Sequence, residues 1–210
     1  YSETSARDQI ISSARFAVER LNRELRHALP NSVRLTNSSQ CLEFIPIIES
    51  TIYTEIPVAP EPATNEMTVI KFDDSLFNNN LSAVVYPLSP SDLYSGTGVL
   101  VNSGKVFGVN SIIDNTTDEW TVSFDGNAQF EQDSPTNRLF FINGSVSYCL
   151  TGNTLTREGI LMAENIINSA PFDVIPATLQ RNSIVQVRFT FENNTEQVTF
   201  NNEVQLPNVP

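Results

Sequence analysis

A helical repeat of apolar residues near the start of the chain constrains the fold more than any other feature of the sequence. Apolar side chains between positions 11 and 28 recur at intervals of 3, 4, 3, 4 and 3, namely Ile11, Ala14, Val18, Leu21, Leu25 and Ala28. This spacing places them along one stripe of an α-helix, which Ile10 and Ala17 widen. Pro30 ends the pattern, because proline lacks an N–H and disfavours helical geometry at the residue before it. We therefore expect one long helix over residues 1–29 that buries this face.

The opposite face of this helix is charged. Three pairs of opposite charge lie four residues apart: Arg15 with Glu19, Glu19 with Arg23, and Arg20 with Glu24. Each exposed pair contributes only about 0.2 to 0.5 kcal/mol to helix stability. These residues therefore predict a solvated face and not a functional site.

Beyond Pro30 the apolar residues alternate with polar ones, and this period of two is typical of half-buried strands in antiparallel sheets. The clearest expected strands are 41–48, 51–58, 105–113, 138–142, 145–151, 184–192 and 197–206. Asn143-Gly144 predicts a tight hairpin between two of them. We expect residues 30–210 to form one β-rich globular head attached to the helix.

The charge of the chain is unevenly placed. The net charge is −12, yet residues 1–29 hold five arginines against four acidic residues, so the negative charge lies in residues 30–210. An acidic body repels phosphate backbones and anionic lipid headgroups, so we expect no nucleic acid partner. The longest apolar runs, 139–142 and 160–163, are far shorter than the roughly 20 residues that a membrane-spanning helix needs.

The chain has two cysteines, Cys41 and Cys149, and both lie in strand-like apolar segments. They are too far apart in sequence for a redox or metal motif, and a single histidine leaves no zinc ligand set. Two interpretations are open: a Cys41–Cys149 disulfide, or two buried free thiols. The lack of competing cysteines and a lysine-poor, asparagine-rich composition typical of exported proteins favour the disulfide.

Catalytic chemistry has little support in the sequence. His27 is the only histidine, and its place in the last turn of the helix suits a role against the helix dipole. The sequence lacks a nucleophile elbow, a phosphate-binding glycine loop and a zinc-protease motif. We therefore expect no enzyme. Three aromatic residues, Tyr53, Tyr94 and Trp120, could line a sugar groove if exposed, although core packing is their more common use.

Two acidic clusters are candidate calcium ligands because hard cations prefer carboxylate oxygens. They are Asp73-Asp74, and Asp114 with Asp118-Glu119. Neither has the spacing of an EF-hand loop, and acidic residues are also common in turns. We expect no cofactor, with calcium as the alternative.

Three segments together resemble a known family: RDQIISSARFAVERLNRELRHALPNSVRL, NRLFFINGSVSYCLTGNTLTRE and the closing EVQLPNVP. They are similar to the minor pilins and pseudopilins of type IV pili and type II secretion systems, in particular to the J-type pseudopilins; residues 50–130 add little. The resemblance implies an α+β, pilin-like fold in which one long N-terminal amphipathic helix packs on antiparallel β-sheet, in two sub-sheets. It also implies a minor subunit that acts in initiation, assembly or tip capping of an MSHA-like type IV pilus or a type II pseudopilus, with other pilin subunits as partners.

Members of this family begin with a prepilin motif and a hydrophobic half-helix, and both are absent from this sequence. We therefore expect the chain to be a fragment cut in mid-helix. The missing segment would anchor the subunit in the inner membrane of a Gram-negative bacterium, with the head in the periplasm. The alternative function is a ligand-binding or adhesive β domain displayed on a filament.

Overall fold

The computed structural model divides the chain into two compact units, and we describe each unit by itself. Unit 1 contains Tyr1–Ala28, Val33–Phe44 and Val146–Val209, and unit 2 contains Leu29–Ser32 and Ile45–Ser145. The described residues are 2–72, 80–115, 118–178, 181–193 and 196–207.

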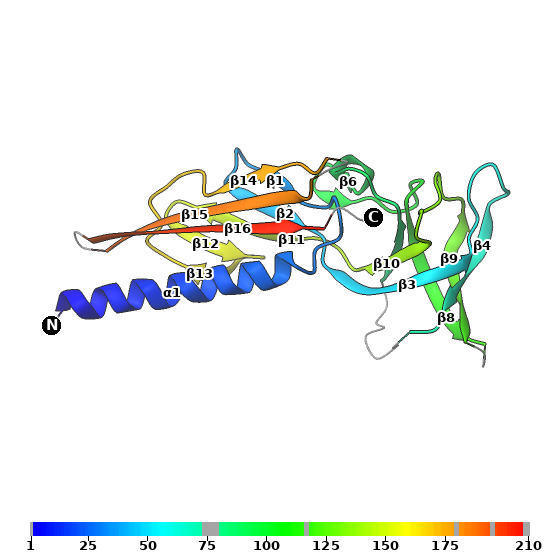
Figure 1. Cartoon of the computed structure of the whole chain (residues 1–210), viewed down its shortest axis with the longest axis horizontal. Helices are drawn as coiled ribbons and strands as arrows, with labels where there is room; N and C mark the ends of the chain where they lie inside the picture. Colours follow the sequence, from blue (N-terminus) through cyan, green and yellow to red (C-terminus); the bar gives the residue numbers. More distant parts are fainter. Residues whose placement is uncertain (1, 73–79, 116–117, 179–180, 194–195, 208–210) are drawn as a thin grey trace. The chain divides into compact units, whose positions relative to one another are not determined.

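Unit 1 consists of helix α1 (Ser2–Leu25) and two antiparallel sheets (Figure 1). The first sheet has the strand order β1-β2-β11-β12-β13, with bounds Arg34–Thr36, Cys41–Phe44, Val146–Thr151, Thr154–Arg157 and Ile160–Ala163. The second sheet has the order β14-β15-β16, with bounds Phe172–Ile175, Ser183–Asn193 and Glu196–Leu206. Alternate residues of β15 are buried and exposed, as expected for a sheet with one face on the core.

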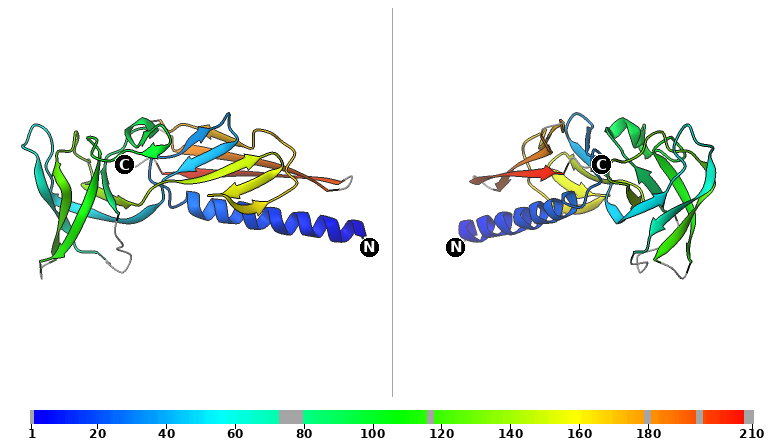
Figure 2. Two further views of the ribbon diagram at one scale, coloured as in Figure 1. Left: turned by 180° about the vertical axis from the view of Figure 1, so that it is seen from behind. Right: turned by 45° about the vertical axis from the view of Figure 1, so that its right-hand side comes forward.

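Helix α1 covers one side of the core between these two sheets. It contacts β13, which ends the first sheet, and also β15 and β16 of the second sheet (Figures 1 and 2). On the other side of the core, β1 contacts β14. The shared core includes Leu21, Leu25, Phe44, Tyr148, Phe189 and Phe191. Burial of each large apolar side chain contributes about 1.5 to 3 kcal/mol, so the helix is an integral part of this unit.

Unit 2 is a closed antiparallel barrel with the strand order β10-β3-β4-β9-β8-β5. The bounds in chain order are β3 Ile47–Glu55, β4 Thr64–Ile70, β5 Ser82–Val85, β8 Val106–Asp114, β9 Glu119–Ala128 and β10 Arg138–Ile142. A short 3₁₀ helix (Pro90–Asp92) precedes a two-stranded ribbon of β6 (Tyr94–Ser95) and β7 (Gly98–Val99). Aromatic side chains dominate the barrel core, among them Tyr53, Phe107, Trp120, Phe124, Phe130 and Phe141. Closure pairs both edges of each strand and so protects the ladder hydrogen bonds.

Leu29–Ser32, just beyond the end of α1 at Leu25, belongs to unit 2. Leu29 N–H donates to the Ile45 carbonyl (2.7 Å), and Tyr94 O–H donates to the Ser32 carbonyl (2.8 Å). Asn31 adopts φ 61° and donates through Nδ2 to the Pro87 carbonyl (2.9 Å). These bonds hold the turn at residues 29–32, where Pro30 prevents a return to helical geometry.

The expected α+β, pilin-like fold is wrong. The structure is 55% strand and 11% helix, so it is mostly β. Among the described residues α1 is the only α-helix; it is 24 residues long and ends at Leu25, four residues before the expected end. The alternating pattern of residues 30–210 builds the sheets and the closed barrel, which contain far more of the chain than the helix does. The hairpin expected at Asn143-Gly144 is wrong, because β10 pairs with β3 and β5 in the barrel, whereas β11 pairs with β2 and β12 in unit 1. Residues 50–130, to which the resemblance does not extend, form most of that barrel.

Candidate functional site

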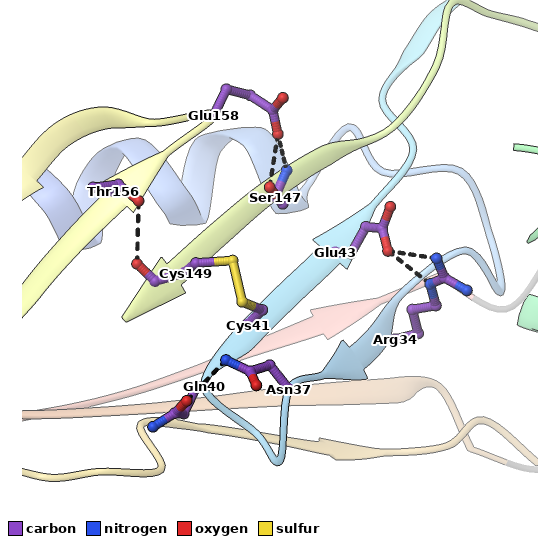
Figure 3. The surroundings of a disulfide bond; sticks show 9 residues. All are labelled: Arg34, Asn37, Gln40, Cys41, Glu43, Ser147, Cys149, Thr156 and Glu158. Carbon is purple, nitrogen blue, oxygen red and sulfur yellow. Dashed lines mark hydrogen bonds and ion pairs between the residues drawn. A yellow bond between two sulfur atoms is a disulfide. The ribbon is translucent and has the colours of Figure 1, made fainter. Parts of the chain in front are cut away.

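Cys41 on β2 and Cys149 on β11 are joined by a disulfide (Figure 3). They are direct partners in the antiparallel register. The neighbouring Leu150 N–H donates to the Gln40 carbonyl (2.8 Å), which makes the cysteine pair a non-hydrogen-bonded one. Side chains approach most closely at such positions, and a disulfide spans them. The structure therefore has the disulfide and not two free thiols.

Most of the predicted helix face is buried. The centre of the observed buried face is rotated slightly about the helix axis from the predicted centre. Ala14, Leu21 and Leu25 are fully buried and Ala28 is buried, whereas Ile11 and Val18 are only half-buried. Ile10 and Ala17, which the sequence placed at the margin of the stripe, are buried instead. The rotation arises because α1 lies between β13 and β16 and so faces the edges of both sheets.

Glu24 of α1 is the centre of a polar cluster that links the helix to the first sheet. Its carboxylate accepts hydrogen bonds from Arg20 (3.0 Å), from Arg157 of β12 (2.9 Å) and from the Tyr148 hydroxyl of β11 (3.1 Å). Arg20 and Arg157 are also its ion-pair partners. Since Arg157 and Tyr148 lie more than a hundred residues away in sequence, helical spacing alone could identify only Arg20.

The cluster shifts the acid–base equilibria of its members. Burial alone would raise the pKa of Glu24, but the hydrogen bonds from Arg157 and then Arg20 outweigh burial and hold that pKa below its usual value. Burial raises the pKa of Tyr148 well above its ordinary value, and the Glu24 charge adds to this shift. Glu24 is therefore a carboxylate at neutral pH, and Tyr148 donates to it as a neutral phenol.

The outward side of α1 and of the turn directly after it carries a surface that we call the outer strip, composed of Arg15, Phe16, Glu19, Arg23 and Arg26. All five residues are exposed, and the Phe16 side chain is 56% accessible to solvent. Of the three expected charge pairs on the helix, only Arg20–Glu24 forms an ion pair among the described residues. Aromatic and arginine side chains are both enriched at protein–protein interfaces, so the outer strip is a candidate contact surface.

The candidate calcium ligands do not assemble into a site in the described part of the chain. Asp73 and Asp74 lie outside the described residues. Asp114 forms an ion pair with Lys71 (2.9 Å), and Asp118 is exposed. Within the described ranges, no group of three or more metal-ligating side chains is close enough to hold an ion. Calcium binding at these carboxylates therefore stays an untested alternative to the expectation of no cofactor.

The three candidate sugar-groove aromatics are buried. Tyr53 and Trp120 lie in the barrel core, and Tyr94 lies in a second core of unit 2. The Tyr53 hydroxyl donates to Asp133 and accepts from the Ser134 N–H (2.8 Å). These side chains therefore pack the interior of unit 2 and present no stacking surface to a ligand.

A polar groove that the sequence did not predict lies on the outward face of β14, β15 and β16. Its volume is about 500 Å³, within the range of small-ligand sites. Side chains from three neighbouring strands line it: Asp173, Gln186, Arg188, Asn201 and Glu203. Gln186 donates to Glu203 (3.4 Å), whereas the side chains of Asp173, Arg188 and Asn201 have no partner among the described residues. Strand alternation places Gln186 and Arg188 on one face, but only the register places Asp173 and Glu203 beside Gln186.

Comparison of the chain with protein-family models, with curated proteins and with solved structures finds no match. In the part of the chain that the structure describes, no helix has the length and apolarity needed to cross a membrane.

Proposed function

We propose that this protein is a minor subunit of a filament, either an MSHA-like type IV pilus or a type II secretion pseudopilus, and that it acts in initiation, assembly or tip capping. The proposal depends on the sequence resemblance and on helix α1, which lies in the segment with the strongest resemblance. It does not depend on the α+β fold, which this protein lacks.

The observation that carries the proposal is the exposed ring of Phe16 on the outer strip. The inward face of α1 cannot contact another subunit, because Leu21 and Leu25 are buried within unit 1. Phe16 is left 56% exposed beside Arg15 and Glu19. Burial of this ring against another subunit would contribute about 1.5 to 3 kcal/mol, and the arginines would favour an acidic partner surface.

In this proposal the subunit is anchored in the inner membrane of a Gram-negative bacterium by a segment outside this chain, and both units are in the periplasm before assembly. The Cys41–Cys149 disulfide supports this location, because disulfides form and persist in oxidising compartments. The partners are other pilin or pseudopilin subunits.

A gene deletion in the host bacterium tests the proposal. Deletion is expected to abolish or greatly reduce surface filaments counted by electron microscopy, and the wild-type gene should restore them. Phe16→Glu should fold normally, because the ring is exposed, yet restore few filaments. Arg188→Ala, on the outward face of β15 in the same unit, is the matched control and should restore them fully. A normal filament number in the deletion strain would overturn the proposal.

The polar groove favours a second candidate, an adhesive domain displayed on a filament. Unpartnered carboxylate, guanidinium and amide groups at Asp173, Arg188 and Asn201 can bind a polar ligand. On this alternative the deletion strain would keep its filaments and lose adhesion. Arg188→Ala would then lose adhesion, while Phe16→Glu would behave as wild type.

A further inference from the structure

The main segment of unit 2, Ile45–Ser145, is inserted between two paired strands of unit 1. Phe44, the last residue of β2, and Val146, the first residue of β11, are direct partners in the antiparallel register. The chain therefore leaves unit 1 and returns to it at the same end of one strand pair. While the barrel is folded, it holds these two chain ends at a fixed separation.

Unfolding of the barrel would release the fixed separation of these two chain ends. Phe44 and Val146 would then be joined by a flexible loop of about 100 residues, whose closure is entropically unfavourable and would weaken the β2–β11 pairing. In an inserted arrangement of this kind, the stability of the surrounding unit would depend on whether the inserted unit is folded.

The disulfide is placed so that the stability of unit 1 no longer depends on whether the barrel is folded. Cys41 and Cys149 are partners in the same strand pair, three residues from Phe44 and Val146 respectively. The bond closes the loop covalently whatever the state of the barrel. In the chain-entropy model, closure of a loop of this size changes the unfolding equilibrium on the order of a thousandfold.

Polar links continue the connection across the neighbouring strands (Figure 3). Arg34 of β1 donates to Glu43 of β2 (2.7 Å), and both side chains are mostly buried. Glu158, after β12, accepts hydrogen bonds from the Ser147 N–H (2.5 Å) and hydroxyl (2.8 Å) of β11. The disulfide thus lies in the middle of a series of cross-strand links that join β1, β2, β11 and the β12 hairpin.

We infer that the Cys41–Cys149 disulfide uncouples the two units, so that unit 1, with helix α1, stays folded when the barrel unfolds. This inference goes beyond the proposed function and does not depend on it. It assigns to the disulfide the protection of one unit from the unfolding of the other, in addition to general stabilisation.

The chain contains a separate spectroscopic probe for each unit. The only tryptophan of the sequence, Trp120, is buried in the barrel, so its fluorescence reports unit 2. The single α-helix of the described residues is α1, so the α-helical component of the far-ultraviolet circular dichroism spectrum reports unit 1. Denaturant unfolding of the full chain can therefore be followed separately for the two units.

The test introduces Phe130→Ala, which removes a fully buried ring from the barrel core and lowers the midpoint of the tryptophan transition. With the disulfide intact, Phe130→Ala should not change the denaturant midpoint of the helix transition, which is followed by circular dichroism. In the Cys41→Ser/Cys149→Ser background, Phe130→Ala should lower the helix midpoint together with the tryptophan midpoint. If the double serine variant does not fold, the same comparison is made between wild-type protein and Phe130→Ala, both reduced with a phosphine, and Phe130→Ala should again lower both midpoints.

Leu155→Ala in β12 is the control for mere weakening of unit 1, because it leaves a cavity in that core and keeps the disulfide. It should lower the helix midpoint, and Phe130→Ala should still have no further effect on that midpoint. Two results would overturn the inference: an equal shift of both midpoints by Phe130→Ala with the disulfide intact, or no shift of the helix midpoint after the disulfide is removed.

Discussion

Among single residues, Glu24 links α1 to the sheet through three hydrogen-bond donors from three elements. Its pKa is lower in the folded state than in the unfolded chain, where the ordinary value is 4.5. A lowered folded pKa stabilises the protein above the unfolded pKa, and this stability is lost as the pH falls through the folded pKa. We predict that Glu24→Gln lowers the unfolding free energy by about 1 to 2 kcal/mol at pH 7. This difference should shrink below about pH 4.5 when denaturant unfolding is followed at 222 nm.

Glu19→Gln is the matched control for this prediction, because Glu19 is an exposed carboxylate of the same helix. It should change the unfolding free energy by less than about 0.5 kcal/mol at either pH. If Glu24→Gln lowered the unfolding free energy by the same amount at pH 3 and at pH 7, packing and not the charge of Glu24 would link the helix to Arg157 and Tyr148.

Among the elements, α1 is held by its apolar face and not by its charges. Leu25 is fully buried in the core of unit 1, whereas Arg23 is exposed on the outer strip. We predict that Leu25→Ala lowers the unfolding free energy of unit 1 by about 2 to 5 kcal/mol, because it leaves a cavity. Arg23→Ala should change it by less than about 0.5 kcal/mol. Similar losses in both variants, measured by denaturant unfolding at 222 nm, would contradict the assignment of the faces.

For the whole molecule, the insertion predicts that unit 1 can fold without the barrel. Phe44 and Val146 are paired, so replacement of Ile45–Ser145 by an Asn-Gly turn should close β2 and β11 into an ordinary hairpin. The shortened chain should keep its helix signal, its disulfide and a cooperative thermal transition, because the core of unit 1 contains no residue of the replaced segment. A chain with no cooperative transition would show that unit 1 requires the inserted unit in order to fold.

The sequence by itself determined features that depend on neighbouring residues: the existence of the helix, the alternation within strands, and the two cysteines as a candidate disulfide. It placed the end of the helix four residues too late, because α1 ends at Leu25 and not directly before Pro30. It did not predict the mostly β fold, because periodicity identifies strands but not how many sheets they form or whether a sheet closes into a barrel. Only the tertiary structure decided that residues 45–145 form an inserted barrel and that Glu24 binds Arg157 and Tyr148. The pairs Glu24–Tyr148 and Glu24–Arg157 are 124 and 133 residues apart. The physical reason is that strand register and chain closure are set by packing between distant segments, to which local patterns of charge and hydrophobicity are insensitive.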